Sequence, residues 1–188
     1  MTNFEEAIEF AVKAHSGMYR KRESTPYILH PFEVATIAGT LTSDEEVLAA
    51  AILHDTVEDT DATIEEIEKK FGSRVAALVA SETEDKRPGI PPEESWRIRK
   101  EESLLNLRNA TDPGVKILWL SDKLSNVRSF YRGFRISGHK IWESFHQKDV
   151  SQQAWYYRTV EELTDELKNT NVWQEYQQYV SLIFEGVE

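Results

Sequence analysis

Apolar residues recur along the chain at the three- and four-residue spacing of amphipathic helices, and no stretch shows the strict alternation of a half-buried strand. A first apolar stripe over residues 4–12 is followed by Gly17, a residue type that commonly ends helices. His15 lies near the end of this stripe, and we expect it to pack against or support a site rather than to bind metal. Pro31 suits the first position of a second helix, which places His30 at the N-cap of that helix. The pattern predicts an all-α fold.

Capping residues and helix breakers mark the remaining elements. Ser43 and Glu46 have the spacing of a capping box, and so do Thr63 and Glu66. The stretch 86–92, which reads KRPGIPP, predicts a surface loop inside the domain. Further helices are expected over residues 74–79, 93–109, 113–128, 151–168 and 171–184.

The size of the chain fits one domain. It has 188 residues, of which 40% are hydrophobic, enough to form a real core. We therefore expect a single domain over residues 1–188, built as a bundle of about eight to ten helices. Its motifs occupy roughly residues 5–130, and we expect helices within 140–186 to pack on that part.

The charge and the residue types exclude several classes of partner. A net charge of −11 repels long nucleic acids, so we expect no nucleic acid polymer as a partner, although a small phosphorylated ligand remains compatible with local basic residues. No apolar run approaches the roughly 18 residues that span a bilayer, and the acidic N-terminus is unlike a signal peptide, so we expect no membrane association. The absence of cysteine excludes disulfides and thiolate metal sites and fits a cytoplasmic location.

The chain is organised around the stretch 48–63, LAAAILHDTVEDTDAT, in which an apolar run leads into His54-Asp55 and then Glu58-Asp59. In a continuous helix, His54 and Glu58 lie four residues apart on one face, as do Asp55 and Asp59. Charges at the end of a buried segment need partners, and a divalent cation such as Mn, Fe, Zn or Ni suits imidazole and carboxylate groups. The alternative is a helix whose last turns become polar as it leaves the core.

A second acid follows a second apolar run. Residues 115–120 are almost wholly apolar, and Asp122 comes directly after them, with Asn126 one helical turn further on. Asp122 is therefore a candidate partner for His54-Asp55.

The order His30, His54-Asp55, Asp122 resembles the H…HD…D pattern of the HD phosphohydrolase superfamily. Longer matches resemble the hydrolase domain of RelA/SpoT proteins and the small alarmone hydrolases. These matches are RK at Arg20-Lys21, PYxxHP at 26–31, LHDxVEDT at 53–60, FGxxVAxLV at 71–79 and DKLxNxR at 122–128.

The resemblance implies an HD-type helical fold and one divalent metal ion, usually Mn²⁺, held by His30, His54, Asp55 and Asp122. Two imidazoles and two carboxylates leave positions on a six-coordinate ion for water and substrate. The resemblance also implies a catalytic acidic pair at 58–59, Glu58 and Asp59. One of these acids orients or deprotonates the water and the other protonates the leaving oxygen, in an order that the sequence leaves open.

The implied reaction removes pyrophosphate from the ribose 3′ position of the nucleotide (p)ppGpp, giving GDP or GTP. The implied substrate contacts are Arg20, Lys21, Lys86 and Asn126. Arg128 fits a substrate contact and a structural ion pair equally well. Because the motifs leave room for only a few more helices, we expect a hydrolase without a synthetase or regulatory domain.

Two other functions remain open. The proline-rich loop and the RKRESTPY loop depart from the usual family pattern, so an HD hydrolase acting on another nucleotide or a phosphomonoester is one alternative. The other is a non-catalytic, metal-bound helical module that binds a nucleotide. The oligomeric state is not indicated.

Overall fold

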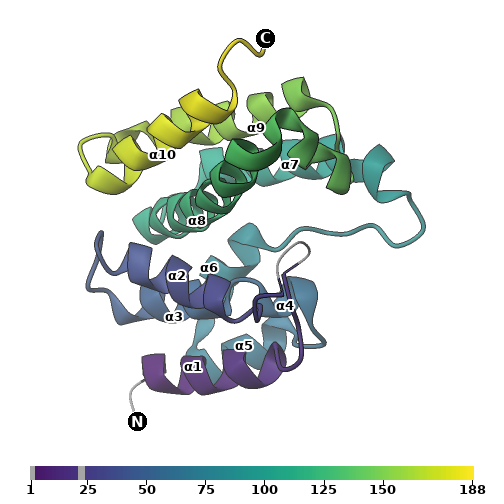
Figure 1. The fold of residues 1–188 in the computed structure, drawn as a ribbon. Helices are drawn as coiled ribbons and strands as arrows, with labels where there is room; N and C mark the ends of the chain where they lie inside the picture. The colour runs from purple at the N-terminus through teal and green to yellow at the C-terminus, as the bar shows by residue number, and fades with distance from the viewer. Residues whose placement is uncertain (1–2, 21–23) are drawn as a thin grey trace. The chain divides into compact units, whose positions relative to one another are not determined.

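The computed structural model describes residues 3–20 and 24–188, and within these residues the chain is helical, which confirms the predicted all-α class (Figure 1). The extended backbone in these residues is limited to one isolated bridge between Tyr19 and Pro26. None of the described helices is both long and apolar enough to cross a membrane. The helices are α1 Asn3–Ala14, α2 Leu29–Ala38, α3 Glu45–Leu53, α4 Thr56–Asp59, α5 Ile64–Phe71, α6 Ser73–Glu82, α7 Pro92–Asn109, α8 Pro113–Ser137, α9 Val150–Leu163 and α10 Asn171–Ile183, with 3-10 helices at Gly138–Ser144 and Asp165–Leu167.

The chain divides into two compact units that alternate in sequence. The first unit comprises Met1–Thr83 and Thr111–Asp122, and the second comprises Glu84–Ala110 and Lys123–Glu188. Helix α8 belongs to the first unit up to Asp122 and to the second unit from Lys123 onward. The expectation of a single domain over residues 1–188 stays a prediction.

Helix α3 forms the centre of the first unit. Its residues Ala49–Leu53 are at most 1% exposed, and the helix packs against α1, α2 and α6. The short alanine side chains leave room for these neighbours to approach closely. Helix α8 also comes close to α3 at Gly114, where an added Cβ would lie 2.8 Å from Cγ2 of Val47. The apolar run before His54 is therefore the most deeply buried part of this unit.

One arginine joins three helix beginnings in the first unit. Nη1 of Arg74 lies 2.8 Å from Oδ2 of Asp44 and 2.8 Å from Oε2 of Glu46, and its Nε lies 2.8 Å from Oδ2 of Asp112. The acids lie before or within the first turns of α3 and α8, where negative charge is favourable. The contacts therefore hold the N-terminal ends of α3, α6 and α8 together.

The two predicted capping boxes have different outcomes. Thr63 caps α5 and accepts from the backbone N–H of Glu66, as predicted. At α3, however, the prediction that Ser43 pairs with Glu46 was wrong, because Asp44 is the N-cap and its side chain accepts from the N–H of Glu46. The carboxylate at this position also binds Arg74, an interaction that local sequence spacing does not reveal.

Aromatic side chains form the core of the second unit. The ring centroids of Trp142 and Phe184 lie 5.6 Å apart, and the ring of Tyr157 stacks on Phe184 at 6.0 Å. Tyr156 and Tyr157 are both buried. Also in this unit, the guanidinium of Arg128 donates to Glu175 at 2.8 Å, which supports the ion-pair interpretation of this residue.

Candidate metal and hydrolytic site

The central stretch is not one continuous helix. Helix α3 ends at Leu53, His54 and Asp55 form a turn, and the four-residue helix α4 begins at Thr56. The hydroxyl of Thr56 donates to the carbonyl of Leu53 at 2.6 Å and so satisfies a backbone group at the end of α3. The turn interrupts the helix expected over 48–63, but the pairing of Asp55 with Asp59 holds. The backbone N–H of Asp59 donates to the carbonyl of Asp55 at 2.9 Å, and both carboxylates approach the hydroxyl of Tyr27.

His30 also differs from its expected place. It lies in the first turn of α2, and the N-cap of that helix is Ile28, which makes no side-chain capping bond. The backbone N–H of His30 donates to the carbonyl of Tyr27 at 2.9 Å. The ring is 4% exposed, so the predicted helix begins slightly earlier than expected and still buries this imidazole.

Four predicted ligands converge in the first unit. The ligand atoms of His30, His54 and Asp122, all buried, lie within 4.8 Å of one another. Nε2 of His30 is 3.0 Å from Oδ1 of Asp122, and Nε2 of His54 is 3.6 Å from the same oxygen. Oδ2 of Asp55 lies 3.1 Å from Nε2 of His54 and 3.4 Å from Nε2 of His30. The cluster combines two imidazoles and two carboxylates, a donor set suited to first-row divalent cations.

The orientation of His54 fits a metal ligand. Its Nδ1 lies 2.9 Å from the carbonyl oxygen of Ala51, an acceptor, which favours the tautomer with the proton on Nδ1. Its Nε2 is buried and faces the carboxylates of Asp55 and Asp122, at 3.1 and 3.6 Å. A backbone carbonyl that fixes the ring and its tautomer is a common support of ligating histidines.

The electrostatics of the cluster also favour a cation. Burial by itself lowers the pKa of His54, but the negative charges of Asp55 and Asp122 raise that pKa well above its ordinary value. Burial raises the pKa of Asp55, whereas the adjacent His54 and then His30 lower it to a value below its usual range. Burial is the largest cause of the lowered pKa of His30. The carboxylates thus attract positive charge to this point, and a divalent ion supplies it while leaving both imidazoles neutral.

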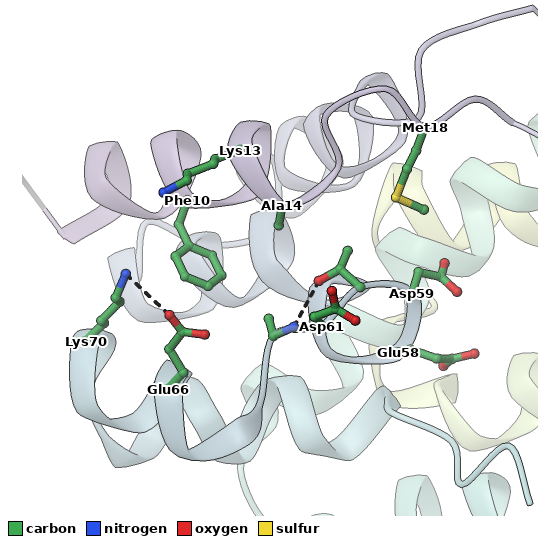
Figure 2. Close-up of a pocket in the computed structure, with 11 residues that line it drawn as sticks. Phe10, Lys13, Ala14, Met18, Glu58, Asp59, Asp61, Glu66 and Lys70 are labelled. Atoms are coloured by element: carbon green, nitrogen blue, oxygen red, sulfur yellow. Dashed lines mark hydrogen bonds and ion pairs between the residues drawn. The ribbon is translucent and has the colours of Figure 1, made fainter. Parts of the chain in front are cut away.

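Glu58 and Asp59 lie beside a pocket of about 640 Å³ in the first unit. Figure 2 shows both acids on the same short helix, with Phe10 and Lys13 on α1 and Lys70 on α5 along another part of the lining. Both acids are half-buried, so their carboxylates are held by the fold and still reach solvent. A carboxylate that exchanges protons with a bound substrate needs such partial exposure.

Tyr27 connects the acidic pair to the predicted metal ligands. Its hydroxyl oxygen lies 2.7 Å from Oδ2 of Asp55 and 2.8 Å from Oδ2 of Asp59. The sequence interpretation missed this residue, although it stands in the PYxxHP motif three positions before His30. The PYxxHP motif was the sequence signal that could have pointed to Tyr27. Residue spacing alone does not reveal that this side chain, which lies before α2, contacts Asp59 in α4.

The predicted substrate contacts are only partly placed. Arg20 is half-buried in the first unit, and its positive charge is one of the causes that lower the pKa of His30. Lys21 lies outside the described residues. Lys86 and Asn126 belong to the second unit, and their roles stay predictions.

A helical fold that brings buried histidine and aspartate side chains from separate segments into one cluster is typical of metal-binding helical proteins. A family model described as the HD domain matches residues 7–149, and the chain therefore belongs to the HD domain family.

Among curated proteins, the chain is 42% identical over 149 residues to human guanosine-3′,5′-bis(diphosphate) 3′-pyrophosphohydrolase MESH1, covering 74% of this chain and 77% of the human protein. It is 43% identical over 125 residues to the enzyme of the same chemical name from Aquifex aeolicus, covering 66% of this chain but only 17% of that longer protein.

Two solved structures are also similar. One is described as a metazoan ortholog of SpoT that hydrolyzes ppGpp; it has a TM-score of 0.77 and 29% identity and covers 100% of this chain and 98% of the other. The other, lmo0812 from Listeria monocytogenes, has a TM-score of 0.71 and 32% identity and covers 83% of this chain and 99% of its own.

Proposed function

We propose that this protein is a metal-dependent hydrolase that removes pyrophosphate from the ribose 3′ position of (p)ppGpp, giving GDP or GTP. The observation that carries the proposal is the buried cluster of His30, His54, Asp55 and Asp122 beside the acids Glu58 and Asp59. The curated relatives bear the name of this activity. A cytoplasmic location belongs to the proposal and is supported by the absence of cysteine.

The proposed ion is Mn²⁺, with His30, His54, Asp55 and Asp122 as its ligands. When bound, such an ion lowers the pKa of a coordinated water and polarises a phosphoryl oxygen. His54 suits this role because its Nδ1 is engaged by a backbone carbonyl and its Nε2 faces the cluster.

The acids of α4 are proposed to move the protons. In the hydrolysis, water attacks the phosphorus of the 3′ diphosphate, the bond to the ribose 3′ oxygen breaks, and that oxygen needs a proton. One carboxylate of the pair takes a proton from the attacking water, and the other delivers a proton to the leaving oxygen. General acid–base catalysis of this kind typically contributes about a hundredfold to ten-thousandfold in rate.

Basic residues are proposed to bind the nucleotide. A guanidinium such as that of Arg20 stacks on a base or pairs with a phosphate, and Lys21, Lys86 and Asn126 are the further proposed contacts. These local positive charges offset the strongly acidic composition of the chain.

The direct test uses metal-stripped protein incubated with ppGpp, with and without Mn²⁺. GDP and pyrophosphate are followed by anion-exchange chromatography. We expect Mn²⁺-dependent release of both products, which His54→Ala abolishes. The matched control is His146→Ala, which removes an exposed imidazole from the second unit and should leave the release unchanged.

A negative result separates the alternatives. If folded, metal-loaded protein leaves ppGpp intact but hydrolyses another nucleotide or a phosphomonoester, the alarmone substrate is wrong and the hydrolase class stands. If it binds metal and nucleotide but hydrolyses nothing in such a panel, the non-catalytic module is the better description.

A further inference from the structure

The hydroxyl of Tyr27 joins two acids that the proposed mechanism treats separately. It is 2.7 Å from Oδ2 of Asp55, a proposed metal ligand, and 2.8 Å from Oδ2 of Asp59, a proposed catalytic acid. A hydroxyl has one hydrogen, so the two carboxylates share this single donor, at distances within the range of O–H···O hydrogen bonds. The position of this one oxygen atom therefore constrains both carboxylates.

The ring of Tyr27 is itself held in place. It packs against His15 with ring centroids 4.9 Å apart and an interplanar angle of 31°, and edge-on against His30 at 6.1 Å. His15 is 3% exposed, and neither of its ring nitrogens has a hydrogen-bond partner within the described residues. In these contacts the imidazole of His15 therefore acts as a packing surface for the tyrosine ring. The direction of the hydroxyl is set by the contacts with His15, which follows α1, and with His30 in α2.

The hydroxyl is the hydrogen-bond donor in both contacts, and the carboxylate oxygens accept. A phenol that keeps its proton offsets the repulsion between two nearby carboxylates, which would otherwise drive the more exposed one outward. Asp59 is half-buried, and the bond to Tyr27 opposes such a movement.

We propose that Tyr27 is a positioning residue that holds the carboxylate of Asp59 at a defined place relative to Asp55 and the metal ligands. The catalytic consequence of this inference rests on the proposed function. The position of the Asp59 carboxylate relative to Asp55 does not depend on which substrate is hydrolysed. Tyr27 itself does not touch the substrate. It acts through Asp59, whose alignment with the scissile bond it preserves.

The first test is structural and needs no substrate. Crystal structures of the wild type and Tyr27→Phe, each with Mn²⁺, are compared at Asp59. The substitution removes only the hydroxyl and keeps the ring that packs on His15. We expect Mn²⁺ in both structures and a displaced Asp59 carboxylate in the variant. An Asp59 carboxylate at its wild-type position in Tyr27→Phe would overturn the proposal.

A second pair of variants tests the same contact if Tyr27→Phe by itself does not fold. In the Asp59→Asn background, the like-charge repulsion is absent, so adding Tyr27→Phe is less damaging to the fold. The Tyr27 hydroxyl can still donate to the amide oxygen at position 59, and the proposal expects the amide to move when this hydrogen bond is removed. An amide that stays in place would count against the proposal even if the single variant cannot be purified.

The kinetic test distinguishes positioning from general support of the fold. Misplacement of a catalytic group by about 1 Å costs about a hundredfold in rate, so we expect Tyr27→Phe to lower kcat for ppGpp by about this factor with little change in KM. Mn²⁺ stoichiometry, measured by electron paramagnetic resonance, should be unchanged. Tyr179→Phe, which removes a half-buried hydroxyl from the second unit, is the matched control and should retain full kcat.

The effects of Tyr27→Phe and Asp59→Asn on kcat should not be additive. If Tyr27 acts through Asp59, then Tyr27→Phe should lower kcat no further in an Asp59→Asn background. Equal losses in both backgrounds would overturn positioning through Asp59. A wild type that does not hydrolyse ppGpp refutes the proposed function, whereas the position of Asp59 in the two crystal structures still decides the inference about Tyr27.

Discussion

Nε2 of His30 in α2 lies 3.0 Å from Oδ1 of Asp122 in α8, and both side chains are almost completely buried. A lone buried carboxylate is costly, and this one is compensated by imidazoles on two other segments of the first unit. The arrangement concentrates charge that a bound cation stabilises.

Removing the metal should destabilise the protein. A ligand that binds only the folded state at about 100 times its Kd raises the free energy of unfolding by about 2.7 kcal/mol, so Mn²⁺ at that excess should stabilise the wild type by this amount. Thermal or urea unfolding with and without chelator measures the difference. His54→Ala should show almost no response to Mn²⁺, whereas His146→Ala should respond as the wild type does. An undiminished response in His54→Ala would contradict the proposed ligand set.

Neutralising the acidic pair should abolish turnover without releasing the metal. Glu58→Gln and Asp59→Asn each remove one carboxylate from the pocket lining, and each should lower kcat by about a hundredfold to ten-thousandfold. Mn²⁺ content, determined on the purified variants, should equal that of the wild type. Full turnover in both variants would show that the assigned proton transfers are wrong.

Adding one methyl group at Gly114 should strain the packing of α3 against α8. A Cβ at this position would lie 2.8 Å from Cγ2 of Val47 and 3.0 Å from Oδ1 of Asp112. Overpacking of a tight core costs about 1–3 kcal/mol, and we expect Gly114→Ala to lose that much stability in urea unfolding. Val47→Ala makes room for the added methyl, so the double variant should lose less stability than the two single losses added together. Simple additivity of the two losses would contradict the close approach.

The buried Glu84 should make the second unit sensitive to acid. Its carboxylate lies 2.6 Å from Nη1 of Arg99 and 2.6 Å from Nζ of Lys100. Burial opposes ionisation, but the charges of Lys100 and then Arg99 lower the pKa of Glu84 below its ordinary value.

Because the folded-state pKa is lowered, the stability from Glu84 is fully present above its unfolded pKa of about 4.5 and is lost as the pH falls through the lower folded value. Glu84→Gln should cost about 1–3 kcal/mol near neutral pH, as expected for loss of hydrogen bonds to charged groups. The difference from the wild type should shrink in acid. Urea unfolding across this pH range measures the effect, and Glu162→Gln, at an exposed position, is the control. A difference that is constant with pH would refute the linkage.

Local patterns were sufficient for the helices and for the identity of the candidate ligands. Helix α5 begins at Thr63 as its capping box predicts, and α8 begins at Pro113 after Asp112. Helical periodicity and capping depend on residues three or four positions apart, so the sequence contains that information directly. The order of His30, His54, Asp55 and Asp122 likewise identified the side chains that the fold brings together.

The tertiary structure decided the features that depend on distant segments. The turn at His54-Asp55 replaces a continuous helix, and Asp44 rather than Ser43 caps α3 and also binds Arg74. The bond from Tyr27 to Asp59 joins the loop before α2 to α4. Such contacts follow from the directions in which packed helices present their side chains, which spacing along one segment does not specify. The sequence by itself thus indicated which candidate ligands the fold brings together, and the tertiary contacts of Tyr27 decided how its side chain is held against Asp55 and Asp59.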